Sequence, residues 1–228
     1  MPRRYWATRA DYVCTSRVPS VVTTASSVVW DFDGVVADTE PVQAAAYEAT
    51  LERFSIQPER RWFNNWVGTP EHRIWAGLRE QFGLSQPVEV LTAERAGIYG
   101  ELALKLQPAW FVTPVLSMRC SHRVVSAGNH HQIEMLLNHW GIRDAFTSIS
   151  ATGSPDGDGR DKAERLVAAL EPCSVLFEDS PRYLTLAAGH RRVGVHHQFN
   201  DLAGLPCDVL VSHASVGVWQ SLSCNQAI

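Results

Sequence analysis

The chain has 228 residues, of which 45% are hydrophobic and 19% charged, an ordinary globular composition with room for one full domain and a smaller one. A formal net charge of −4 and a pI near 6.1 give no basic footprint, so we expect no nucleic-acid partner. Apolar runs stay well below the roughly eighteen residues of a membrane span, so we also expect no membrane partner.

The cysteines are odd in number, widely scattered and without a Cys-x-x-Cys pair. They are Cys14, Cys120, Cys173, Cys207 and Cys224. This pattern favours reduced thiols over a disulfide framework or a zinc site, and it indicates a cytoplasmic protein.

The first twenty residues begin with several arginines and then a partly apolar stretch, which imitates a secretory leader. Pro19 and Ser20 interrupt that stretch, and the following residues through Ser27 are too polar for a leader. We therefore expect residues 1–20 to form a loose N-terminal extension.

An apolar segment beginning at Val28 runs directly into Asp31, Asp33 and Gly34. Such a run, bounded by a turn signal, predicts a buried strand, and ligands gather beyond the carboxyl ends of strands in open α/β sheets. One carboxylate there could attack as a nucleophile while the other moves protons. The alternative interpretation is an Asp-Gly turn that closes a hairpin.

Residues 41–109 have helical spacing. Pro41 suits a first helical turn, and apolar residues then recur at intervals of three and four, with further helices expected at 70–82 and 88–106. From residue 110 onward, short apolar runs alternate with helical stretches. The strands are expected at 124–126, 146–149, 175–177, 193–195 and 209–211, and the helices at 131–140, 161–170 and 181–188.

This alternation predicts an α/β fold, a doubly wound, Rossmann-like parallel sheet with helices on both faces. The sheet domain would comprise residues 21–40 and 110–228, with 41–109 as an inserted helical domain.

Three further groups of polar residues lie at predicted strand ends or helix starts. Ser126 precedes Ala127, Gly128 and Asn129, where a hydroxyl and main-chain N–H groups could hold a phosphoryl oxygen, although a plain helix-entry turn has the same pattern.

Lys162 is one of only two lysines against eighteen arginines, and its compact ammonium suits a site shared by a carboxylate and a phosphate. The alternative for Lys162 is a solvent-exposed helix residue. Glu178 and Asp179 close a third apolar strand, where adjacent acids are costly unless they face a cation or solvent.

These four motifs, in this order, resemble those of the haloacid dehalogenase-like superfamily, in its helical-cap phosphatase and β-phosphoglucomutase-like branch. The first motif is carried by Asp31-Phe32-Asp33-Gly34-Val35 with Asp38-Thr39-Glu40. The resemblance spans residues 28–211 and implies that 41–109 is a cap that closes over the site. The Lys-Pro pairing common in relatives is absent here, because Ala163 follows Lys162.

The resemblance implies phosphoryl transfer to Asp31, with Asp33 as the acid and base, and a Mg²⁺ ion and Lys162 offsetting negative charge. Asp31 and Asp179 would give carboxylate oxygens to Mg²⁺, Asp33 its main-chain carbonyl, and Glu178 direct or water-mediated support. Ser126, with the main chain of Gly34 and of residues 127–129, would bind the phosphate. A monomer or weak homodimer is expected.

Three functions compete within this resemblance. Dehalogenases of this kind lack the second aspartate of the first motif, so Asp33 favours phosphate chemistry. Phosphomutases carry a histidine where Gln43 stands, which places a phosphatase of a small phosphorylated metabolite, such as a sugar phosphate, ahead of a mutase. Outside the enzyme class, the alternatives are a non-catalytic binding or regulatory protein that retains the fold and a receiver-like phosphoacceptor domain.

Residues 60–73 combine aromatic, amide and cationic side chains that suit substrate contact, with His72 and Arg73 as the candidates. At least two of Trp62, Trp66 and Trp75 are expected to be core residues instead. The remaining histidines, including the pairs at 130–131 and 196–197, are interpreted as solvated loop residues without metal spacing.

Overall fold

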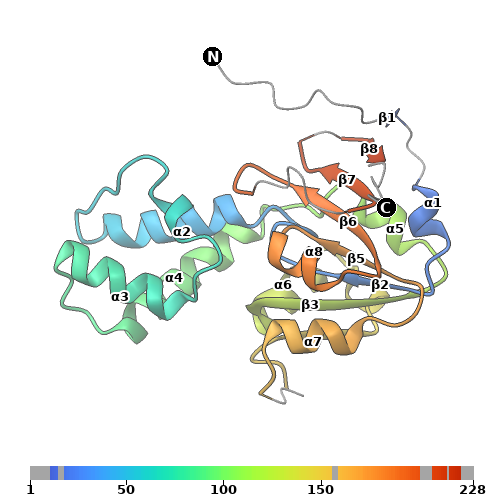
Figure 1. Cartoon of the computed structure of the whole chain (residues 1–228). Coiled ribbons are helices and arrows are strands. Elements are labelled where there is room, and N and C mark those ends of the chain that lie inside the picture. The colour runs from blue at the N-terminus through green and yellow to red at the C-terminus, as the bar shows by residue number, and fades with distance from the viewer. Residues whose placement is uncertain (1–10, 15–17, 156–158, 201–206, 215, 222–228) are drawn as a thin grey trace. The chain divides into compact units, whose positions relative to one another are not determined.

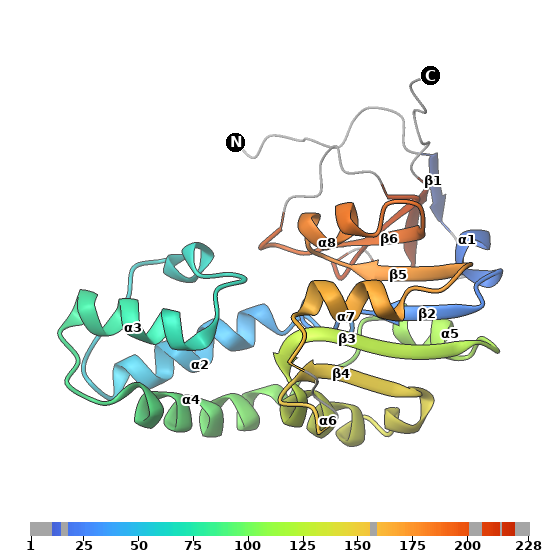
Figure 2. The same ribbon diagram turned by 60° about the horizontal axis from the view of Figure 1, so that its bottom comes forward.

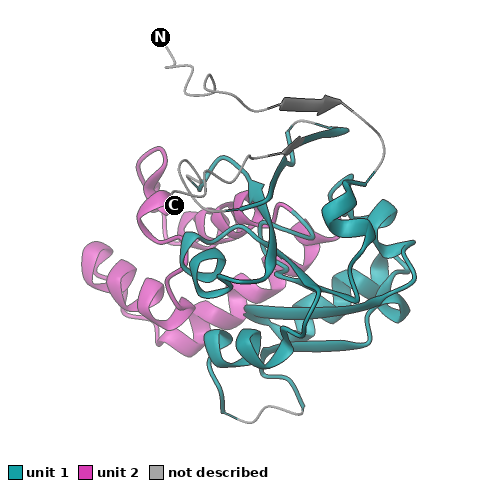
Figure 3. Ribbon diagram, turned by 45° about the vertical axis from the view of Figure 1, so that its right-hand side comes forward, with its two compact units in different colours: residues 1–37, 108–228 teal, residues 38–107 magenta. Residues whose placement is uncertain are grey.

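The computed structural model describes residues 11–14, 18–155, 159–200, 207–214 and 216–221 (Figure 1). The chain divides into two compact units: residues 1–37 with 108–228, and residues 38–107 (Figure 3). The first unit contains the sheet and the second is helical, so the predicted α/β class with inserted helices is confirmed.

The sheet unit is built on eight strands in the order β1-β8-β7-β6-β5-β2-β3-β4. The strands are β1 (Asp11–Cys14), β2 (Ser27–Trp30), β3 (Ser121–Asn129), β4 (Ser148–Thr152), β5 (Ser174–Glu178), β6 (Arg191–His196), β7 (Val209–Ser212) and β8 (Val218–Ser221). The six strands from β7 to β4 pair in parallel, whereas β8 and β1 are antiparallel. The predicted parallel sheet therefore carries an antiparallel edge.

Strand β2 lies between β3 and β5, and all four of its residues are buried. A strand covered on both faces is a continuous apolar run in sequence, which explains Val28-Val29-Trp30. Because the parallel strands end at the same edge of the sheet, the residues that follow β2, β3, β5 and β6 are brought together there.

Helices cover both faces of the sheet (Figures 1 and 2). Helices α7 (Lys162–Ala169) and α8 (Pro181–Leu186) lie on one face, where Val29 and Leu176 pack against Leu166. Helices α5 (Val112–Leu116) and α6 (His130–His139) lie on the other. There Trp30 stacks on Phe177 with ring centroids 4.4 Å apart.

The antiparallel edge includes elements that the sequence did not predict. Strand β1 pairs with β8 and lies within the predicted loose extension, and a short helix, α1 (Ser20–Thr23), precedes β2. Residues 1–10 and 15–17 of that extension lie outside the described residues.

The helical unit consists of α2 (Glu40–Glu52), α3 (Glu71–Phe82), α4 (Val88–Ala103) and the 3₁₀ helix η1 (Trp62–Asn65). Its core includes Tyr47, Leu51 and the fully buried Trp75, with Trp62 and Trp66 packed against it, as expected for cap-core tryptophans. Gly77 makes this packing possible, because a Cβ there would lie 2.3 Å from Trp66 Cη2.

Predicted elements agree with the observed ones to within a few residues, apart from the sheet edge, α5 and the two 3₁₀ helices, of which the second is η2 (Arg143–Ala145). Among the described residues, no helix combines the length and apolarity that crossing a bilayer requires.

Candidate active site

Asp31 is the first residue after β2, and it is buried. Its N–H donates to the carbonyl of Phe177 on β5 at 2.9 Å, and the Phe32 N–H donates to Asp31 Oδ1 at 2.7 Å. The main chain therefore fixes both the position of this residue and the orientation of its carboxylate.

Lys162 reaches Asp31 from the start of α7. Asp161 and Glu164 form a capping box that fixes this helix terminus. The Lys162 side chain, only 5% exposed, places Nζ 2.5 Å from Asp31 Oδ2 and 2.9 Å from Glu178 Oε2. The interpretation of Lys162 as a solvent-exposed helix residue is thereby excluded.

The charges of this cluster control one another's ionisation. Burial lowers the pKa of Lys162, but the carboxylates of Asp31 and Glu178 outweigh burial and raise it, so the ammonium stays charged. Burial and the negative charge of Asp31 raise the pKa of Glu178, and Lys162 opposes that rise. One lysine therefore does not balance the buried carboxylates.

Asp31, Glu178 and Asp179 can each direct a carboxylate oxygen so that all three atoms lie within 4.8 Å of one another. Against one ammonium, three carboxylates leave a formal excess of two negative charges. Glu178 is fully buried, its Oε1 accepts the Ser180 N–H at 3.0 Å, and its Oε2 shares the Lys162 ammonium with Asp31. Hard oxygen ligands with two surplus negative charges fit a divalent cation such as Mg²⁺, so the structure supports a metal site here.

Asp33 is not among the three residues of this carboxylate cluster. It is half-buried, and a Cβ built on Gly128 would lie 2.4 Å from its Oδ2, so its carboxylate packs against Gly128, two residues after Ser126. The two aspartates of the first motif thus have different environments. The predicted contribution of Asp33 to a metal is through its main-chain carbonyl, and this stays a prediction.

The segment from Ser126 to Asn129 belongs to an irregular end of β3 instead of a turn after it. Ser126 is buried and its Oγ accepts the Gly128 N–H at 3.0 Å. Asn129 Oδ1 caps α6 by accepting the Gln132 N–H. The Ala127 carbonyl accepts the Thr152 hydroxyl. The roles of these residues in phosphate binding stay predictions.

His72 and Arg73 are exposed residues of the first turn of α3, in the helical unit. Neither belongs to the apolar core of that unit. Their assignment to the substrate stays a prediction.

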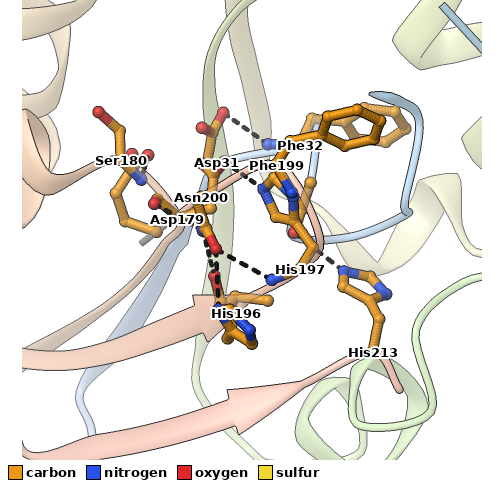
Figure 4. Close-up of polar contacts among 12 residues, drawn as sticks. Asp31, Phe32, Asp179, Ser180, His196, His197, Phe199, Asn200 and His213 are labelled. Atoms are coloured by element: carbon orange, nitrogen blue, oxygen red, sulfur yellow. Dashed lines mark hydrogen bonds and ion pairs between the residues drawn. The ribbon is translucent and has the colours of Figure 1, made fainter. Parts of the chain in front are cut away.

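The interpretation of the histidine pairs as solvated loop residues is wrong. His130 begins α6 and lies 3.5 Å from Glu134, and His196 ends β6. His197 is buried, and its Nε2 lies 2.8 Å from Asp179 Oδ2 (Figure 4).

The sequence did contain a signal for His197, because it lies two residues after the predicted strand 193–195, at the edge where the other candidate residues gather. Asn200 and His213, which hydrogen-bond to the main chain of Asp179 and Gly34, carried no comparable signal.

A family model described as "Haloacid dehalogenase-like hydrolase" matches residues 28–157, more than half of the chain. The protein belongs to this family of hydrolases. No curated protein matches the chain.

Solved structures share the fold at low identity. The chain is similar to a putative β-phosphoglucomutase from Thermotoga maritima, with a TM-score of 0.65, 20% identity, and coverage of 84% of this chain and 96% of that one. It is also similar to CbbY from Rhodobacter sphaeroides in complex with xylulose-(1,5)bisphosphate. The TM-score is 0.66 and the identity 20%, with coverage of 85% of this chain and 96% of that one. A third similar structure is a predicted phosphoglycolate phosphatase from Haemophilus somnus. Its TM-score is 0.59 at 15% identity, with coverage of 78% of this chain and 87% of that one.

Proposed function

We propose that this hydrolase is a Mg²⁺-dependent phosphatase that cleaves a small phosphorylated metabolite through a phosphoryl-aspartate at Asp31. The observation that carries the proposal is the buried cluster of Asp31, Lys162, Glu178 and Asp179 at the carboxyl ends of β2 and β5. Its surplus negative charge matches the needs of a divalent cation, and its lysine contacts the Asp31 carboxylate directly.

In this proposal an Asp31 oxygen attacks phosphorus while the bond from phosphorus to the leaving oxygen breaks. Asp33 gives its proton to that oxygen, then accepts a proton from the water that attacks the phosphoryl-aspartate and releases inorganic phosphate. Asp31 is thereby regenerated. When bound, Mg²⁺ would be held by Asp31, Asp179, Glu178 and the Asp33 carbonyl, and it would supply positive charge to the phosphoryl oxygens.

The separate environments of the two aspartates support this division of labour. The Lys162 ammonium lies 2.5 Å from Asp31 Oδ2 and holds the carboxylate of the proposed nucleophile in place. Asp33 instead has its carboxylate against Gly128, beside Ser126 of the proposed phosphate site. Phosphate binding would use the Ser126 hydroxyl and the main-chain N–H groups of Gly34 and residues 127–129, with the Gly128 N–H exchanging Ser126 Oγ for a phosphate oxygen.

A phosphomutase is the second candidate, because one similar structure carries that name and another was solved with a sugar bisphosphate. Gln43, where phosphomutases carry a histidine, favours the phosphatase. These neighbours support sugar phosphates as substrates for this chain, with His72 and Arg73 as contacts in a cap that closes over the site. A binding protein without activity would have no reason to keep the buried carboxylates and their lysine.

The test is phosphate release from a panel of small phosphate esters, with and without Mg²⁺, by the intact chain and by Asp31→Asn. We expect Mg²⁺-dependent release that falls at least about 1,000-fold in the variant, because the nucleophile is lost. Asp144→Asn, which changes an exposed aspartate of η2, is the matched control and should retain full release. Release that persists in Asp31→Asn would refute the mechanism, and hexose phosphate interconversion without release would identify a mutase.

A further inference from the structure

His197 lies directly after β6 and its side chain is only 1% exposed. The imidazole Nε2 lies 2.8 Å from Asp179 Oδ2, within hydrogen-bond distance of a carboxylate in the candidate metal site (Figure 4). A side chain this deeply buried is unable to meet substrate. Its contact with Asp179 therefore serves a purpose different from substrate recognition.

The hydrogen bonds of the ring define which nitrogen carries the proton. The Phe199 N–H donates to His197 Nδ1 at 3.2 Å, so Nδ1 must present a lone pair. The proton then resides on Nε2, which donates to Asp179 Oδ2. A neutral donor fixes the orientation of a carboxylate without cancelling the negative charge that a metal needs.

Asn200 fixes the main chain around the same contact. Its Nδ2 donates to the Asp179 carbonyl at 2.9 Å and to the Val195 carbonyl at 2.8 Å, and its Oδ1 accepts the His197 N–H at 3.0 Å. We refer to His197 and Asn200 together as the clamp. The clamp holds Asp179 by its side chain and its main chain from the end of the neighbouring strand.

Gly34 has no side chain, and this leaves room for the contact between His197 and Asp179. Its φ of +71° is a conformation that L side chains rarely adopt, and a Cβ there would lie 2.8 Å from His197 Nε2 and 2.9 Å from Asp179 Oδ2. His213 Nε2 donates to the Gly34 carbonyl at 2.9 Å and holds this turn in place. The glycine of the first motif is therefore required by the His197–Asp179 contact, in addition to its proposed role with phosphate.

We propose that His197 is a positioning residue, whose Nε2–H orients the Asp179 carboxylate toward a divalent cation shared with Asp31 and Glu178. The inference rests on the proposed function, since it assumes that these carboxylates bind Mg²⁺. Ligands whose orientation is fixed by outer hydrogen bonds bind metal more tightly, because less freedom is lost on binding.

The test compares two variants of similar length in the full chain, His197→Gln and His197→Met, by calorimetric titration with Mg²⁺ alone. The glutamine amide can place a donor near the position of Nε2, whereas methionine fills the space without one. We expect His197→Met to weaken Mg²⁺ binding about 10- to 100-fold and His197→Gln to restore it to within about threefold of the wild type. His122→Met, at a second buried histidine that contacts Trp30 and Cys120, is the matched control and should leave Mg²⁺ affinity unchanged.

The outcomes separate this inference from the proposed function. Absence of Mg²⁺ binding by the wild type would refute the metal site itself, before any variant is considered. Wild-type binding with equal affinity in His197→Met would leave the metal site intact and overturn the role of His197. A His197→Gln as weak as His197→Met would overturn the donor role. If circular dichroism shows His197→Met to be unfolded, His197→Asn, whose amide is too short to reach Asp179, replaces it with the same expected loss.

Discussion

The two units each contain a buried cation in contact with carboxylates, Lys162 and Arg95, and these two cations have opposite surroundings. Lys162 in the sheet unit contacts Asp31 and Glu178, whose side chains are only 7% and 1% exposed. Arg95 in the helical unit contacts one carboxylate, Glu71, which is 35% exposed, at 3.1 Å. Its guanidinium also lies over the Tyr47 ring at 4.3 Å.

The difference is one of charge balance. Arg95 is matched by a single carboxylate that still reaches water, which is the arrangement of a structural ion pair. Around Lys162 the buried carboxylates outnumber the cation, an arrangement that costs free energy unless another cation enters. Unbalanced buried charge therefore identifies the site, whereas a buried cation alone does not.

Lys162→Met should have the largest effect. Removing the ammonium takes away the positive charge that contacts Asp31 and that would offset the phosphoryl group, so we expect kcat/KM for the best ester to fall about 100- to 1,000-fold. Lys105→Met is the matched control, because Lys105 is the chain's other lysine and is exposed. Retention of wild-type kcat/KM by Lys162→Met would show that the two buried cations are equivalent after all.

Arg95→Met should change stability instead of catalysis. The buried guanidinium contributes a partly screened ion pair and contacts with the Tyr47 and Tyr99 rings, so its loss should cost about 2 kcal/mol in the free energy of unfolding. Urea denaturation followed by tryptophan fluorescence measures it. Arg53→Met, which breaks an exposed pair with Glu94, should cost less than about 0.5 kcal/mol. Equal losses in both variants would contradict the assigned role of Arg95.

His122 extends the comparison to a buried base beside a tryptophan N–H and a thiol. Burial lowers the pKa of His122 below its ordinary value of 6.5. The unfolded chain therefore binds a proton at higher pH than the folded chain, and stability should decrease as the pH falls below 6.5.

His122→Asn, which can keep an acceptor for Trp30, should show a smaller fall in Tm between pH 7.5 and pH 5.5 than the wild type, as followed by circular dichroism. This is the smallest of the expected effects. An unchanged fall in Tm would assign the pH dependence to other groups.

The sequence was sufficient to predict the parallel strands and the residues that follow them, because an acid at the end of a continuous apolar run is costly unless a cation or water meets it. It predicted Lys162 from its rarity, but not its burial, which depends on how α7 packs against β3. The sequence also did not predict that Asp31 and Asp33 have different environments. The chain leaves strand geometry here and turns at Gly34, whose φ is positive, so the two-residue spacing of the aspartates does not describe where each side chain points.

Long-range pairings account for what was missed. His197 contacts Asp179 across 18 positions, and its role depends on the hydrogen bonds of Asn200 and on the space left by Gly34. Strand β1 pairs with β8, some two hundred positions away, and both are short and polar enough to be ambiguous in isolation.

The Ala109 N–H donates to the Val36 carbonyl at 2.8 Å, so the chain leaves the sheet unit and returns to it at adjacent points. The helical insertion is therefore equivalent to a long loop in the sheet unit, and the two ends of this loop are held together by a hydrogen bond. Because the entropy of closing a loop grows only with the logarithm of its length, insertions at this point can differ greatly in size at little thermodynamic cost to the sheet. By the same reasoning, a short turn could replace residues 38–107 at this junction. We expect the sheet unit, which bears the carboxylates at its strand ends, to fold without the insertion.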